Sequence, residues 1–203
     1  MGGGLSARQM AKLVQLARLA ISKKMDGKKI IETAEAKGIF GSDFEAVCME
    51  QGAFVTLTIG GSLRGCIGSL VAEGPLWESV RDTALNAAFG DTRFTPLSKE
   101  EIADVKIEVS VLSPLREMKY SNWRDLLSSL QPGAHGLLLR FANGAGATYL
   151  PQVWEQIPKK EDFLSSLCMK AGMPPSAWKA EKPEAFTYTV QMAEENSGKH
   201  PAK

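Results

Sequence analysis

The chain has 203 residues, 44% of them hydrophobic and 23% charged, which is the balance of an ordinary globular domain able to bury its own core. The 24 basic and 23 acidic residues leave a net charge of +1, so the sequence offers no general electrostatic attraction for nucleic acid or a membrane surface. Its three cysteines are widely separated, and no apolar run approaches the ~18–20 residues of a membrane span. These features predict reduced thiols and a cytoplasmic location.

The first part of the chain predicts a helix followed by a β-hairpin. Ser6 and Gln9 form a capping-box pattern, and apolar residues continue at helical spacing until Gly27. Gly60-Gly61 separates the apolar run over 53–59 from a second strand, a pattern typical of a tight hairpin. We therefore expect these two strands to be antiparallel.

The middle of the chain predicts two more helices and a strand. Pro75 opens a helical pattern that Gly90 ends. Ser98 and Glu101 repeat the capping-box spacing and predict a short helix. Apolar and polar residues then alternate strictly over 105–111, which indicates a strand with one polar face.

The last third of the chain predicts another hairpin, a helix and a final strand. Residues 136–141 and 147–150 read as strands around Asn143-Gly144, joined by a loop of more than two residues. A helix is expected over 161–171, and alternation over 186–192 predicts one last strand. Hairpins with helices between them favour an α+β fold with antiparallel sheets and flanking helices.

The hexapeptide Leu63-Arg64-Gly65-Cys66-Ile67-Gly68 is the most distinctive segment. Residues two apart in a strand share a face, so Arg64 and Cys66 are expected to point the same way. Gly65 and Gly68 mark a bend or a close approach beside the thiol. Because a nearby guanidinium stabilises a thiolate, the pattern suggests a reactive cysteine. A buried structural Cys66, and an Arg64 held in an ion pair, remain alternatives.

Several ordered segments besides the hexapeptide carry a family resemblance: Gly52–Leu57, Asp91–Phe94, Glu108–Leu112, Leu150–Gln156 and Phe163–Gly172. With them the chain resembles the AMMECR-type domain family, whose bacterial and archaeal members are called AmmeMemoRadiSam system protein A. The resemblance implies a single AMMECR-type domain over 1–203 with two intimately packed subdomains. The larger would come from the N- and C-terminal segments and the smaller from the middle of the chain. The biochemical activity of this family is not established.

Six side chains are candidates for a cleft around the hexapeptide: Arg64, Cys66, Asp91, Arg93, Glu108 and Gln152. The guanidiniums and the amide suit a carboxylate or amide ligand, with Cys66 as nucleophile or acceptor and Glu108 or Asp91 as general base. These assignments rest on residue type. A loop-fixing ion pair between Asp91 and Arg93, and a solvated strand face at Glu108, stay open as alternatives.

The sequence contains no recognisable metal or phosphate motif. The histidines, His135 and His200, and the isolated cysteines give no metal-ligand spacing, and Gly60-Gly61 lacks the Gly-Lys-Ser/Thr ending of a phosphate loop. We expect no metal and no cofactor.

The resemblance links the chain to Memo-like proteins and to a radical S-adenosylmethionine enzyme, and any iron–sulfur chemistry would belong to such a partner. Two hypotheses follow: an enzyme or enzyme component that uses Cys66, or a non-catalytic subunit that binds a partner protein.

Overall fold

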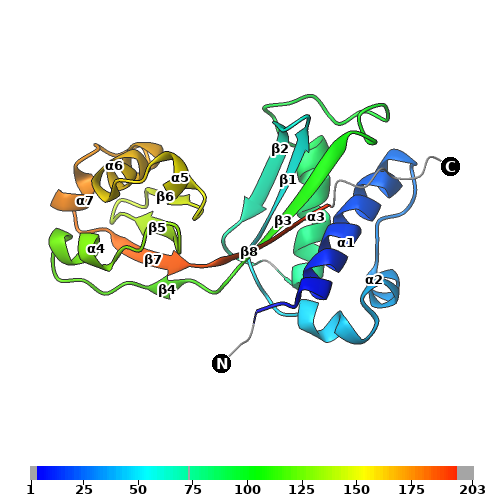
Figure 1. Ribbon diagram of the computed structural model, residues 1–203, viewed down its shortest axis with the longest axis horizontal. Helices are drawn as coiled ribbons and strands as arrows, with labels where there is room; N and C mark the ends of the chain where they lie inside the picture. The colour runs from blue at the N-terminus through cyan, green and yellow to red at the C-terminus, as the bar shows by residue number, and fades with distance from the viewer. Residues whose placement is uncertain (1–3, 73, 196–203) are drawn as a thin grey trace. The chain divides into compact units, whose positions relative to one another are not determined.

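The computed structural model describes residues 4–72 and 74–195 and divides the chain into two compact units (Figure 1). Unit 1 contains the residues up to Leu112 together with those from Gln191 onward, and unit 2 is Ser113–Val190. Each unit contains a four-stranded antiparallel sheet, and helices accompany both sheets. The predicted α+β fold is therefore confirmed. The close packing of two subdomains that the resemblance implies stays a prediction.

Unit 1 has three α-helices, one 3-10 helix and four strands in the sheet order β2-β1-β3-β8. These elements are α1 (Ala7–Met25), α2 (Thr33–Phe40), η1 (Gly41–Val47), β1 (Ala53–Ile59), β2 (Ser62–Ser69), α3 (Leu76–Phe89), β3 (Val105–Leu112) and β8 (Val190–Glu194). Helices α1 and α3 pack on one face of the sheet (Figure 1). Strand β2 lies at an edge of the sheet.

The first helix and the strands form where the sequence predicts them. Ser6 and Gln9 make both hydrogen bonds of the capping box that begins α1. In β1, Val55 and Leu57 are fully buried among the residues of the α1 and α3 core, while Thr56 between them is half-buried. This alternation gives the sheet a helix-covered face and an opposite, more open face.

The Gly60-Gly61 hairpin is confirmed, with both glycines at positive φ (56° and 80°). A Cβ atom on Gly65 would collide with the carbonyl oxygen of Ala87 on α3. Gly65 therefore allows the helix backbone to approach the strand.

Two predicted elements are wrong. Residues 99–104 form turns rather than a short helix, although the Ser98 amide does donate to the Glu101 carboxylate at 2.9 Å. The predicted last strand is divided at Thr189: β7 (Glu184–Tyr188) belongs to the sheet of unit 2, and β8 belongs to the sheet of unit 1. Side-chain alternation continues across Thr189, so it could not reveal the change of partner strand.

Unit 2 has the strand order β4-β7-β5-β6 and four short helices. Its elements, besides β7, are β4 (Arg116–Glu117), α4 (Trp123–Ser129), β5 (Gly136–Arg140), β6 (Gly146–Tyr149), α5 (Val153–Gln156), α6 (Lys160–Lys170) and α7 (Ala177–Ala180). The predicted hairpin around Asn143-Gly144 is β5–β6, and α6 matches the predicted helix. Unit 2 has a separate hydrophobic core, in which Trp154 stacks on Phe163. Among the described residues, no helix combines the length and apolar character needed to cross a bilayer.

Candidate functional site

Three polar side chains form a row across the open face of the unit 1 sheet. Thr56 on β1 lies opposite Cys66 on β2 and also opposite Glu108 on β3. The Thr56 hydroxyl donates to the Cys66 sulfur at 3.4 Å. Neighbouring strands are about 4.8 Å apart, so the backbones of Cys66 and Glu108 are separated by about 10 Å. A ligand that lies over Thr56 would meet the thiol on one side and the carboxyl group on the other.

The next row on the same face forms one wall of this arrangement. Phe54 lies opposite both Gly68 and Ser110. A Cβ atom on Gly68 would collide with the Phe54 ring, so the ring can lie over this position only because residue 68 has no side chain. Ser110 is buried, and its hydroxyl donates to Glu108 at 3.3 Å. The thiol and the carboxyl group are therefore bordered by an aromatic ring.

A β-bulge at Arg64 determines the direction of Cys66. On the turn side of the bulge Thr58 lies opposite Leu63, and on the other side Leu57 lies opposite Gly65, so Arg64 is the extra residue of β2. Without this extra residue the register would shift by one and turn Cys66 toward the helix-covered face. The simple alternation that predicted a shared face for Arg64 and Cys66 does not apply across a bulge.

The side chains of Asp91 and Arg93 take the place of a neighbouring strand at the outer edge of β2. The backbone N–H of Cys66 donates to Asp91 Oδ2 at 2.9 Å, and Arg93 Nη2 donates to the Cys66 carbonyl oxygen at 3.0 Å. The Arg93 guanidinium also donates two hydrogen bonds to Asp91, of 2.9 and 2.6 Å, and the Arg93 amide donates a third at 3.2 Å. The Asp91–Arg93 ion pair that the sequence left as an alternative is present, and it fixes the backbone of the cysteine.

This pair also determines the charges around Cys66. The hydrogen bond from Arg93, and then that from the Cys66 amide, hold the pKa of Asp91 well below its usual range. Asp91 is therefore a poor proton acceptor near neutral pH. Its carboxylate in turn raises the pKa of Arg93, and Cys66 adds a smaller electrostatic effect in the same direction.

Arg64 is engaged in an ion pair of its own. Its Nε and Nη2 atoms donate to the two carboxylate oxygens of Glu101 at 2.7 and 2.9 Å, and its guanidinium lies 5.9 Å from the Phe94 ring centre. The hydrogen bond to Arg64 is the largest cause that lowers the pKa of Glu101 to about 2. The structure thus contains the structural ion pair that the sequence left open for Arg64.

Glu108 is the carboxyl group best suited to exchange a proton. Burial raises its pKa, the hydrogen bond from Ser110 opposes this rise, and the charge of Glu194 adds to it. Of the two candidate bases named from the sequence, the electrostatics favour Glu108 over Asp91.

Comparison with known proteins gives the chain a family. The AMMECR1 family model matches residues 14–193. A protein of Nanoarchaeum equitans is 37% identical over 186 residues, covering 91% of this chain and 99% of that protein. A protein of Methanopyrus kandleri is 34% identical and covers 100% of this chain and 96% of its own length. The crystal structure of an uncharacterized protein from Pyrococcus horikoshii superposes with a TM-score of 0.82 at 30% identity, covering 95% and 94% of the two chains. The chain belongs to the AMMECR1 family.

The remaining candidates of this AMMECR1-family chain lie outside the row. Gln152 immediately precedes α5 in unit 2, so its place in a site with Cys66 stays a prediction.

The other two cysteines of the chain, Cys48 and Cys168, lie away from the row. Cys168 is fully buried, and burial raises the pKa of both Cys168 and Cys48. No three His, Cys, Asp or Glu side chains within residues 4–72 and 74–195 are grouped as metal ligands.

Sequence reasoning missed Thr56 and Glu101. The spacing of Ser98 and Glu101 did mark this glutamate, but as a helix cap rather than as the partner of Arg64. Thr56 carried no signal, because its place opposite Cys66 depends on the bulge.

Proposed function

We propose that this AMMECR1-family chain acts through Cys66 as a component of a modification pathway. The observation that supports it best is the row formed by Cys66, Thr56 and Glu108 on the open sheet face. It combines a hydrogen-bonded sulfur, a neighbouring hydroxyl and a carboxyl group whose pKa is raised. This arrangement suits a ligand with an electrophilic carbon.

In the proposed chemistry Cys66, at one end of the row, is the nucleophile and Glu108, at the other end, is the proton donor. The Cys66 thiol, whose sulfur accepts a hydrogen bond from Thr56, releases its proton to water, and the sulfur forms a bond to the electrophilic carbon. The electron pair displaced from that carbon moves to the attached atom. Protonated Glu108 gives its proton to this atom, and its raised pKa keeps the proton available closer to neutral pH. Asp91 and Arg93 act as positioning residues because they hold the backbone of Cys66.

The decisive test is alkylation of the native protein with iodoacetamide, followed by peptide mass spectrometry. We expect Cys66 to be modified faster than the buried Cys168 and the half-buried Cys48, whose pKa values are raised by burial. The same protein thus supplies two control thiols. A native Cys66 that resists modification as well as Cys168 does would contradict the proposal.

The partners are proposed from the resemblance alone: a Memo-like protein and a radical S-adenosylmethionine enzyme encoded separately. Co-purification from the native host should recover one of them. Arg93→Ala should reduce the joint activity without unfolding the chain, because 55% of the Arg93 side chain is exposed. A chain that is recovered alone after gentle cross-linking and turns over a small substrate unaided would contradict this part of the proposal.

A second candidate function is that of a non-catalytic subunit that binds a partner protein. It is favoured by the apolar side chains on the same open face, where Leu63 is 45% exposed and Phe54 is half-buried. Replacing Cys66 with serine separates the two functions. Loss of pathway activity with partner binding intact supports the thiol function, whereas full activity of Cys66→Ser supports the binding subunit.

A further inference from the structure

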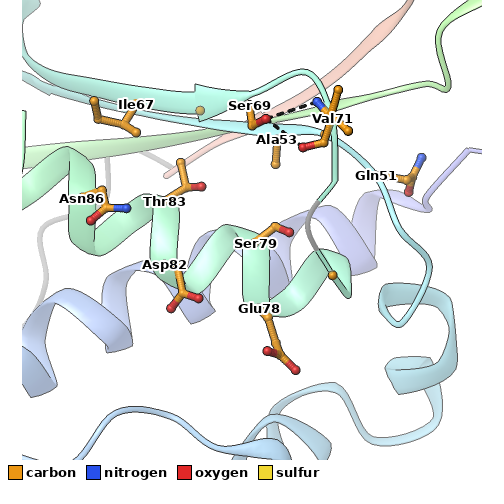
Figure 2. Close-up of a pocket in the computed structure, with 13 residues that line it drawn as sticks. Gln51, Ala53, Ile67, Ser69, Val71, Glu78, Ser79, Asp82, Thr83 and Asn86 are labelled. Atoms are coloured by element: carbon orange, nitrogen blue, oxygen red, sulfur yellow. Dashed lines mark hydrogen bonds between the residues drawn. The ribbon is translucent and has the colours of Figure 1, made fainter.

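A pocket of about 300 Å³ lies between the end of β2 and α3, separate from the row around Cys66 (Figure 2). Its strand side includes Ile67, Gly68 and Ser69. Figure 2 shows β2 above the pocket, α3 below it and the connection between them at one end. The pocket therefore lies next to the outer edge of the sheet.

The strand edge beside this pocket has backbone groups ready to pair. Both backbone groups of Cys66 bind Asp91 and Arg93, so they point away from β1. The direction of backbone groups alternates along a strand, so those of Gly68, two residues on, point outward as well. Outside the ladder with β1, no backbone hydrogen bond of Gly68 is present within the described part of the chain. One more extended segment could pair there.

The helix side of the pocket is a stripe of neutral polar groups. Ser79, Thr83 and Asn86 follow one another at helical spacing and face the pocket in Figure 2. No hydrogen bond of these three side chains is present among the described residues. They offer hydroxyl and carbonyl oxygens to a ligand.

The charged residues among those that line the pocket are both acidic, Glu78 and Asp82. Arg81 lies between them in sequence and pairs with both, at 2.7 Å to Asp82 and 3.7 Å to Glu78. Its guanidinium lies 5.1 Å from the Trp77 ring centre and donates to the Ile31 carbonyl oxygen. Arg81 does not line the pocket. The two carboxylates exceed this guanidinium by one negative charge, so the pocket is suited to a cationic group rather than an anionic one.

We propose that this pocket binds a lysine or arginine side chain carried on an extended peptide segment. The backbone of the segment pairs with Gly68 at the edge of β2, as in β-strand addition. Its basic side chain enters the pocket, where the oxygens of Thr83 and Asn86 accept hydrogen bonds and Glu78 and Asp82 supply charge. The proposal does not depend on any chemistry of Cys66.

The test uses the full-length protein and NMR titration with N-acetyl-lysine-N-methylamide. This probe carries both the peptide groups and the cation. We expect saturable shifts of the Gly68 backbone amide and the Asn86 side-chain amide. Two controls each remove one part: N-acetyl-norleucine-N-methylamide has no charge, and n-butylammonium has no peptide groups. Each should bind about tenfold more weakly, the factor that corresponds to ~1.4 kcal/mol.

Two variants test the assigned side chains. Glu78→Gln and Thr83→Val should each weaken binding of the lysine probe several-fold, while circular dichroism shows unchanged folding. Glu155→Gln, an exposed acidic position in unit 2, serves as the matched control and should bind normally. A probe with a Kd near 1 mM would nearly saturate the pocket at about 10 mM. The proposal is therefore overturned if the lysine probe gives no saturable shift at that concentration. It is equally overturned if n-butylammonium binds as tightly as the lysine probe.

Discussion

At the scale of single residues, the environment of Cys66 depends on Arg93 more than on Arg64. The sequence places Arg64 two positions from the thiol, yet its guanidinium is neutralised by Glu101. Arg93 instead binds the Cys66 carbonyl oxygen, and Cys66 contributes to the raised pKa of Arg93. The two arginines therefore differ in their effect on the thiol.

Replacement of each arginine by glutamine tests this difference. Arg93→Gln removes a positive charge and leaves Asp91 uncompensated beside Cys66, so we expect alkylation at pH 7 to slow by about three- to tenfold. Arg64→Gln should change the rate by less than about twofold, because the Arg64 guanidinium bonds to Glu101 rather than to Cys66. Both rates are measured by iodoacetamide labelling and mass spectrometry. Equal slowing in the two variants would contradict the prediction, because it would mean that both arginines affect the reactivity of Cys66 to the same extent.

Glu108 gives a pH-dependent prediction at the same scale. Its pKa is raised in the folded chain, so the unfolded chain loses this proton first as pH rises, and stability falls between the unfolded and the folded pKa. Glu108→Gln removes this loss. We expect the variant to have a higher Tm than the parent at pH 7 and an equal Tm near pH 3, where both states hold the proton. Thermal unfolding followed by circular dichroism measures both values, and a variant that is less stable at pH 7 contradicts the assignment.

At the scale of secondary structure, the hairpin illustrates what the sequence could and could not predict. Gly60-Gly61 and the alternation of β1 identify both strands and their antiparallel pairing. The register beyond the turn depends on the bulge at Arg64, which follows from the packing of Gly65 on Ala87 and the pairing of Arg64 with Glu101. Those contacts join segments far apart in the chain, so no local sequence pattern could predict the bulge.

The two glycines around Cys66 should be intolerant of a side chain. Gly65→Ala places a methyl group against the Ala87 carbonyl on α3, and Gly68→Ala places one against the Phe54 ring. We expect each change to lower the free energy of unfolding by about 2–3 kcal/mol, as overpacking does. The control is Gly38→Ala in α2, where nothing lies near the added methyl group and stability should rise by about 0.5–1 kcal/mol. Urea unfolding compares all three, and two glycine variants as stable as the parent would contradict the packing described.

At the scale of the whole molecule, the sequence predicted the fold class and most elements, but not how the C-terminal strand is shared. The alternation over 186–192 continues without a break, while the hydrogen bonds change from one sheet to the other around Thr189. The Thr189 amide donates to Ser113 Oγ, and the Ser113 amide donates to the Thr189 carbonyl oxygen. Pairing between residues 76 positions apart has no periodic signature in the sequence. The same holds for the candidate site: the sequence identified Cys66 and Glu108 as candidate residues, but it could not predict that they lie in one row with Thr56 across three strands.

The segment that follows Thr189 should carry much of the stability of unit 1. Glu195, immediately after β8, accepts two hydrogen bonds from Arg18 of α1 and a third from the Ile107 amide of β3 at 3.1 Å. The Glu195 side chain is only 15% exposed, so Glu195→Ala leaves Arg18 without its carboxylate partner and the Ile107 amide without its side-chain acceptor, and we expect a loss of about 2 kcal/mol. The neighbouring Glu194→Ala removes an exposed pair with Lys106 and should cost less than about 0.5 kcal/mol. Hydrogen exchange should show faster opening of α1 and β3 in the Glu195 variant, with the amides of β5 and β7 unchanged. Equal effects of the two glutamates, or equal acceleration in both units, would contradict this role of the C-terminal segment.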